Sequence, residues 1–167
     1  MDDLLYFYSA SAQISFVMLG FWWAIVAFKH DEWMADPLLK RMSHYVSLHF
    51  LLPGTMSLVS LLAVENSVLW RSGFGIGGVF GAVAAVMSFQ SARSGSGAAP
   101  ARSVLWVGMV AVYVCIAAVA AGGGELTDAL GLGERALVVE GMLVGLLLFL
   151  GAQFAWTLFS QSRRPVA

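Results

Sequence analysis

Charge is scarce in this sequence. Only 11% of its 167 residues are charged, whereas a typical soluble domain carries about 25%. Hydrophobic residues make up 59% of the chain, and its mean hydropathy is +0.81. A soluble chain of this size could not bury so much apolar surface, so the surrounding solvent must be lipid. The composition therefore predicts an integral membrane protein.

Cysteines, basic stripes and catalytic motifs are also rare or missing. The single cysteine, Cys115, excludes an internal disulfide and is expected to be a small packing residue. A net charge of −1 without a basic stripe gives no reason to expect a nucleic-acid partner. The sequence has no phosphate-binding loop, no Cys or His cluster with metal-ligand spacing and no Ser-His-Asp grouping. We therefore expect no enzyme activity, no metal and no cofactor.

Long apolar runs are what the sequence does contain. A transmembrane helix needs about 20 mostly apolar residues. Five stretches reach that length, at about 4–28, 44–64, 72–91, 103–122 and 136–160. The connections between them are short, and no alternating β pattern is present. The sequence predicts a single all-α domain over residues 1–167, built as a bundle of five transmembrane helices.

Basic residues are divided unequally between the two sets of loops. Seven of the nine fall on one side of the predicted membrane: Lys29, Lys40, Arg41, Arg93, Arg102, Arg163 and Arg164. Arg71 and Arg135 fall on the other side. Because Lys and Arg concentrate in cytoplasmic loops, we expect the N-terminus outside, the C-terminus in the cytoplasm, and a location in the cell (inner or plasma) membrane.

The longest connection, about residues 31–43, is expected to lie on the cytoplasmic surface of the membrane. Asp36 followed by Pro37 is typical of a helix N-cap and first helical position. The second spanning helix should therefore begin there and enter the bilayer after one or two turns. Trp33 is expected to contact the lipid interface, while Lys40 and Arg41 reach lipid phosphates.

Strongly polar residues interrupt the predicted spans at five positions: Gln13, His44, His49, Glu140 and Gln153. Such groups cost several kcal/mol in lipid, so they are expected to face the bundle interior, a partner chain or water. His44 lies at headgroup level, and Gln153 points about 140° away from Glu140 around the same helix. Neither is assigned to a site.

The segment HYVSLHFLLPG, residues 44–54, combines an imidazole with a helix breaker. Pro53 frees the backbone carbonyl four residues earlier, which belongs to His49, and Ser60 shares the helix face of His49. Either His49 hydrogen-bonds a neighbouring helix, or it forms a proton or ion site. The second interpretation requires that the imidazole faces a wet, protein-lined interior.

Glu140 lies near the start of the fifth span. It is expected either to pair with Arg135 or Arg71, or to form an acidic ring in a pore or the mouth of a proton path. Gln13 lies near mid-membrane, on the helix face of Tyr6 and Ser9, and either holds helices together or continues that path. The path requires the first, second and fifth spans to be neighbours.

The third span carries a row of small residues. Gly73, Gly77 and Gly81 recur every four residues, and Ala85 continues the row. Such a row lets two helix backbones approach closely within a membrane. Because five helices leave little room for an internal path, we expect this face to be buried between copies in a homo-oligomer. Packing within the chain is the alternative.

Three classes of function remain. The favoured hypothesis is a homo-oligomeric channel or transporter for protons or small cations in the lipid bilayer, with His49, Glu140, Gln13, Pro53 and Ser60 on its pathway. The alternative is a non-catalytic accessory or scaffold subunit of a larger membrane complex. A haem protein with His49 as axial ligand is the third; no second suitable His exists in the spans, so Met18 or another copy would have to supply the other ligand.

Overall fold

The computed structural model describes residues 2–63, 66–95, 100–129, 131 and 136–161, with the backbone alone at 92–95, 100–103 and 161. These residues form the helices α1 (Asp2–Phe28), α2 (His30–Ala35), α3 (Pro37–Leu62), α4 (Ser67–Gly95), α5 (Pro100–Ala129) and α6 (Ala136–Gln161). Five of the helices, all except α2, are long and apolar enough to cross a membrane. The predicted all-α class with five spans is confirmed.

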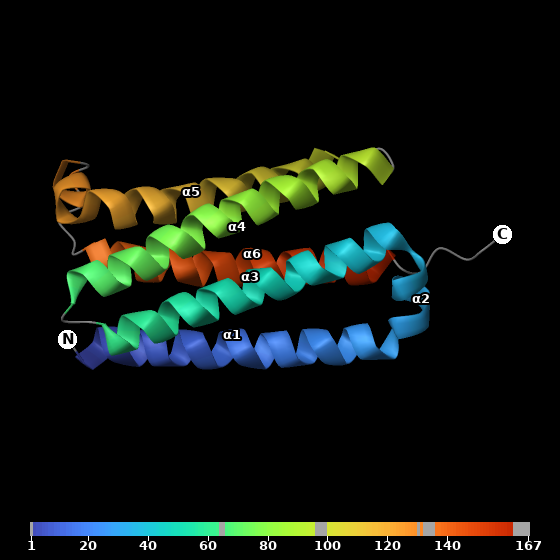
Figure 1. Ribbon diagram of the computed structural model, residues 1–167, viewed down its shortest axis with the longest axis horizontal. Helices are drawn as coiled ribbons and strands as arrows, with labels where there is room; N and C mark the ends of the chain where they lie inside the picture. The colour runs from blue at the N-terminus through green and yellow to red at the C-terminus, as the bar shows by residue number, and fades with distance from the viewer. Residues whose placement is uncertain (1, 64–65, 96–99, 130, 132–135, 162–167) are drawn as a thin grey trace.

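The five long helices lie side by side along the long axis of the molecule, and α2 covers one end of the bundle (Figure 1). Helix α3 is the most central, because it packs against α1, α4 and α6, while α5 packs against α4 and α6. Helix α1 also contacts α6. The first turn of α1 and the last turn of α6 lie at opposite ends of the bundle (Figure 1). We call these the Asp2 end and the α2 end; which of them faces the cytoplasm stays a prediction.

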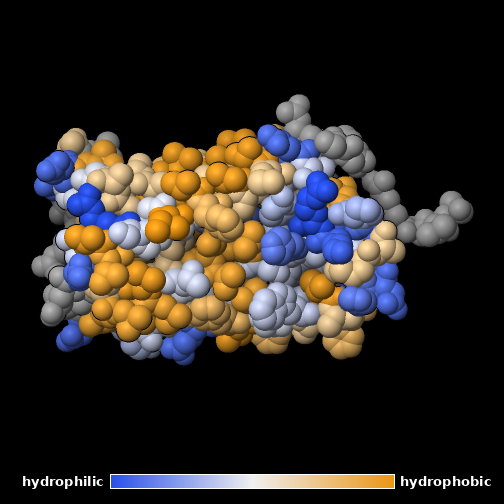
Figure 2. Space-filling model, viewed as in Figure 1, coloured by the Kyte–Doolittle hydropathy of each residue, from blue (hydrophilic) through white to orange (hydrophobic). Residues whose placement is uncertain are grey.

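The outer surface of the bundle suits lipid. A broad hydrophobic band covers the middle of the face seen in Figure 2, with hydrophilic residues at both ends. Helices α4 and α5 contribute large apolar side chains such as Ile76 (71% exposed), Val79 (58%) and Val107 (63%). Monomeric soluble proteins rarely expose apolar patches of this extent. The protein is a multi-spanning membrane protein.

The start of α3 is the one predicted at Asp36 and Pro37. The Asp36 carboxylate accepts hydrogen bonds from the backbone N–H groups of Leu38 (2.8 Å) and Leu39 (3.3 Å), and Pro37 occupies the first turn. The cap satisfies amide donors that have no partner inside the helix. The predicted surface segment 31–43 therefore consists of most of α2 and the first turns of α3.

The expectation that Trp33 contacts lipid is wrong. Its side chain has 0% exposure, and its ring lies 5.5 Å from that of Trp22, measured between centroids. Trp22 in turn donates from Nε1 to the backbone oxygen of Ser43 at 2.9 Å. Helix α2 is thus docked onto α1 and α3 by aromatic packing.

Helix α5 is interrupted near the Asp2 end. Gly123 has φ 55° and ψ −142°, a conformation that glycine adopts easily and other residues rarely do. The break frees carbonyl groups in the preceding turn, and the Arg71 guanidinium of α4 donates to two of them, Ala120 O (2.7 Å) and Ala121 O. A cation at the carboxyl end of a helix is also favourable for the helix dipole. Arg71 therefore joins α4 to the broken end of α5.

The glycine row of α4 packs within the chain. A Cβ added at Gly73 would lie 2.7 Å from Val59 Cγ1, and one at Gly77 would lie 2.7 Å from Met56 Sδ, both in α3. A Cβ at Gly81 would overlap the Tyr113 ring of α5. The row is therefore occupied by α3 and α5 and does not provide the expected interface between copies. The prediction of a homo-oligomer is therefore no longer supported by the glycine row.

A glycine beside that row lies directly against the backbone of α5. A Cβ added at Gly78 would lie 2.8 Å from the Ala117 nitrogen and 2.9 Å from the Tyr113 oxygen, so it would meet main-chain atoms of α5. A side chain can turn away from such a contact, whereas a helix backbone can move only with the helix.

We predict that Gly78→Ala lowers the free energy of unfolding in detergent by about 1–3 kcal/mol, because the added methyl group pushes α4 away from α5. Gly108→Ala is the matched control, since a Cβ at Gly108 would have nothing within 4 Å. Denaturation of both variants in mixed micelles measures the difference. Equal effects would contradict the close α4–α5 contact.

Candidate functional site

Buried polar side chains gather where α1, α3 and α6 meet. Helix α1 presents Tyr8, Ser11 and Ser15, which share one face because they follow an i, i+3, i+7 spacing. Helix α3 presents His49, Ser57 and Ser60, and α6 adds Glu140. All seven side chains are buried. We call these seven residues the buried polar seam.

Glu140 forms the end of the seam nearer the Asp2 end. Its side chain has 0% exposure, and neither carboxyl oxygen has a hydrogen-bond partner among the described residues. The Tyr8 hydroxyl donates to the backbone oxygen of Leu137 at 2.6 Å. The Tyr8 side chain also lies near those of Ser60 and Glu140.

Glycine makes the approach of Tyr8 to α6 possible. A Cβ added at Gly141 would lie 3.4 Å from the Tyr8 hydroxyl oxygen and 3.1 Å from Phe7 Cε1. Gly141 directly follows Glu140 in the chain, so the tyrosine reaches α6 beside the carboxyl group. The end of the seam is therefore a compact group of oxygen atoms from three helices.

Arg71, one of the two basic partners expected for Glu140, does not pair with it. The guanidinium of Arg71 is engaged by α5 carbonyls, and Arg135 lies outside the described residues. An ionised carboxylate buried without a partner costs several kcal/mol, and the neutral acid costs much less. A carboxylate at Glu140 would therefore need a compensating cation in this conformation, whereas the protonated acid would not.

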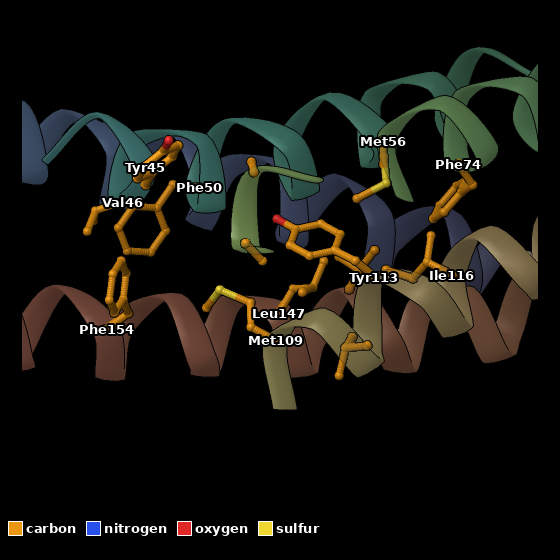
Figure 3. Close-up of a cluster of buried hydrophobic side chains, with 14 of the residues drawn as sticks. Tyr45, Val46, Phe50, Met56, Phe74, Met109, Tyr113, Ile116, Leu147 and Phe154 are labelled. Atoms are coloured by element: carbon orange, nitrogen blue, oxygen red, sulfur yellow. The ribbon is translucent and has the colours of Figure 1, made fainter. Parts of the chain in front are cut away.

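His49 lies at the other end of the seam. Its Nδ1 is 3.1 Å from the Tyr113 hydroxyl, its exposure is 0%, and its Nε2 has no partner among the described residues. The imidazole centroid lies 5.7 Å from the Tyr113 ring and 5.8 Å from the Phe154 ring. Tyr113 reaches from α5 towards α3, and Phe154 points from α6 towards Phe50 (Figure 3).

The His49 imidazole thus faces the protein interior, as the site hypothesis requires, but aromatic rings enclose it. It has no accessible surface in this conformation, so the wet surroundings that the hypothesis also requires are not present. The carbonyl of His49, which Pro53 frees, is covered by α6: a Cβ added at Gly151 would lie 3.4 Å from that oxygen. This part of the helix serves close packing with α6.

Hydroxyl groups lie between the two ends. Ser60 is eleven residues after His49 in α3, which corresponds to about 16 Å along the helix axis. Ser57 lies between Ser60 and His49 in α3, and its hydroxyl donates to Pro53 O at 2.7 Å. Ser15 of α1 lies beside Gly54, and its hydroxyl has no partner among the described residues. The seam therefore has polar atoms at several depths from Glu140 to His49.

Gln13 lies outside the seam. Its side chain is exposed on the outer face of α1 and donates from Nε2 to Ser9 Oγ of the same helix at 3.2 Å. The neighbouring positions of α1, α3 and α6 that the predicted path requires are present. The structure therefore brings together Glu140, Ser60 and Pro53 with His49 along one interior line, while Gln13 faces away from it.

Sequence reasoning missed Tyr8, Ser11, Ser15 and Tyr113. A signal for the first three was present, because they repeat at helical spacing along α1. It competed with an equally regular row, Tyr6, Ser9 and Gln13, on another face of the helix. No local pattern marks Tyr113. It becomes a hydrogen-bond partner of His49 only because of how α5 packs in the bundle.

Among the described residues, no group of three or more His, Cys, Asp or Glu side chains could hold a metal ion. The chain shows no significant match to a protein-family model, to a curated protein or to a solved structure.

We predict that Tyr8→Phe lowers the free energy of unfolding by about 0.5–1.5 kcal/mol, because it removes the hydrogen bond from a buried hydroxyl to Leu137 O. Tyr6→Phe, in the same helix, should have no effect, since Tyr6 is 79% exposed. Denaturation of the two variants in the same detergent gives the comparison. Equal stability of both variants and the unmodified protein would contradict the Tyr8 contact.

Proposed function

We propose that the protein carries protons across its membrane and that Glu140 is the residue that takes them up and releases them. The observation that carries this proposal is the fully buried Glu140 carboxyl, whose two oxygens have no partner among the described residues. An ionisable group inside a membrane span is expensive and is typically functional. No described residue compensates a negative charge on Glu140. Loss of its proton would therefore have to be coupled to the arrival of another cation or of water.

The oxygen atoms around Tyr8 support proton transfer. The Tyr8 and Ser60 hydroxyls each have one proton, and the acceptors within their reach include Leu137 O and Met56 O. The Tyr8 and Ser60 side chains also lie near each other. A hydroxyl both donates and accepts, so the hydrogen bonds of this group can be reoriented when Glu140 gains or loses a proton. Ser57, Ser15 and His49 would extend the route towards the α2 end.

A proton fits the seam better than a metal cation does. A hard cation such as Ca²⁺ takes six to eight oxygen ligands, and Mg²⁺ takes six. The open cavities at the α2 end and between α4 and α5 are lined by other residues, neither Glu140 nor His49 among them. A proton needs only a continuous set of donors and acceptors. Because both ends of the seam are buried, transport would require a change of conformation, as in alternating-access transporters.

An accessory role without transport is the second candidate. The observation that favours it is the enclosure of the His49 imidazole by Tyr113 and Phe154, which would give the ring a purely structural hydrogen bond. Serine hydroxyls bonded to the carbonyls of their own helix, such as Ser57 and Ser60, are also compatible with simple helix packing. The two candidates differ in whether the isolated protein moves protons.

We predict that liposomes containing the purified protein acidify when a pH gradient is imposed and a potassium–valinomycin clamp holds the membrane potential. Glu140→Gln should reduce this flux to that of protein-free liposomes, because a carboxamide has nearly the same shape but cannot release a proton. A pH-sensitive dye trapped inside the liposomes reports the flux. Replacing every small cation except the K⁺ of the clamp by a bulky organic one should leave the proton flux intact.

Two variants serve as controls for this experiment. Glu125→Gln removes an exposed carboxylate, and Gln13→Leu removes the polar group on the outer face of α1; neither should change the flux. Flux that persists in Glu140→Gln would disprove the assigned residue. No flux with the unmodified protein would refute transport by the isolated protein, and stoichiometric co-purification of a larger membrane protein would then favour the accessory role.

A further inference from the structure

A cavity opens at the α2 end, between the first turns of α3 and the last described turns of α4. Its volume is about 500 Å³. Arg41 and Tyr45 line it from α3, and Met87 and Ser91 line it from α4. None of these residues belongs to the buried polar seam, so the cavity is a separate feature of the bundle.

Among the described residues of the lining, Arg41 is the only charged one, and none carries a carboxylate. Its Nη1 donates to Ser91 Oγ at 3.4 Å, which is long for a hydrogen bond. A guanidinium has five N–H donors, so most of them remain for a ligand. Nearby acids do not compete for Arg41: Glu32 is paired with Lys29 at 2.9 Å, and the Asp36 carboxylate caps α3.

The position of the cavity indicates what kind of anion it suits. Hydrophilic residues at the α2 end border the hydrophobic band on the face shown in Figure 2. Leu38 and Met87 give the cavity an apolar part, and the Tyr45 hydroxyl points away from Val46 and Phe50 of the core (Figure 3). A polar part next to an apolar part matches a lipid headgroup continued by its acyl chains.

We propose that this cavity binds the headgroup phosphate of an anionic phospholipid. Arg41 contacts the phosphate through charge-assisted hydrogen bonds, the Tyr45 hydroxyl donates a further one, and the acyl chains lie along Leu38 and Met87. A zwitterionic headgroup fits less well, because the lining has no carboxylate for a choline or ethanolamine cation. A free phosphate ion would leave the apolar part of the cavity uncovered. This inference does not depend on the proposed proton transport.

Titration of the purified protein in detergent, followed by native mass spectrometry, tests the proposal. Short-chain phosphatidylglycerol should bind about ten-fold more tightly than phosphatidylcholine of the same chain length. Inorganic phosphate at the same concentration should not displace it. Arg41→Gln should weaken binding of phosphatidylglycerol about ten-fold, and Tyr45→Phe should weaken it by a smaller factor.

Lys40→Gln is the matched control, because it also removes one positive charge at the α2 end, but Lys40 lines a different cavity. It should leave phosphatidylglycerol binding unchanged. Equal weakening by Arg41→Gln and Lys40→Gln would reduce the effect to general surface charge and overturn the proposal. Displacement by inorganic phosphate, or equal binding of the two lipids, would overturn it as well. If Arg41→Gln fails to fold, Tyr45→Phe is the test: weaker binding of phosphatidylglycerol would support the proposal, and unchanged binding would overturn it.

Discussion

The hydrocarbon core of a bilayer offers no hydrogen-bond partners, and this constraint governs the interior of the bundle. Each polar group placed between the helices must find its partner inside the protein. Most do so locally, as when the hydroxyl of Ser88 donates to Ala84 O at 2.7 Å. Where α5 breaks at Gly123, a side chain from another helix supplies the donors, because Arg71 binds the freed carbonyls. The polar atoms left without partners among the described residues belong to Ser15, Trp33, His49, Trp106 and Glu140. Three of these residues lie on the buried polar seam, which is why the seam is the candidate site.

Close packing and the seam depend on the same contacts. Tyr113 lies against Gly81 of α4 and also reaches Nδ1 of His49 in α3. A small residue in one helix therefore positions the hydrogen-bond partner of a residue in another. At the opposite end, Gly141 allows Tyr8 to approach α6 beside Glu140. Glycine thus acts in this protein by making room for tyrosine hydroxyls where the bundle is otherwise apolar, in addition to bringing helix backbones together.

The two ends of the seam have different surroundings, which suggests different roles. Near Glu140, the Tyr8 hydroxyl donates to Leu137 O, whereas the His49 imidazole lies beside the Tyr113 and Phe154 rings. A charge at either position is expensive in this conformation, so the proposed proton transport would require the helices to move. Pro53 and Gly54 lie between the ends, at the part of α3 where a proline has removed one backbone hydrogen bond. This part of α3 is the natural place for such a movement to begin.

The sequence by itself determined the features that depend on local properties. Hydropathy over about 20 residues identified the five spans, and Asp36 with Pro37 identified the start of α3 because a cap needs only its own first turn. Other features required the tertiary structure. Helix α1 carries two rows of polar residues at the same spacing, and apolar residues surround both, so periodicity could not tell that Tyr8, Ser11 and Ser15 face inwards while Gln13 faces outwards. The same holds for the glycine row and for Arg71. Their partners depend on α3 and α5 lying beside α4, and contacts between helices distant in sequence leave no local pattern.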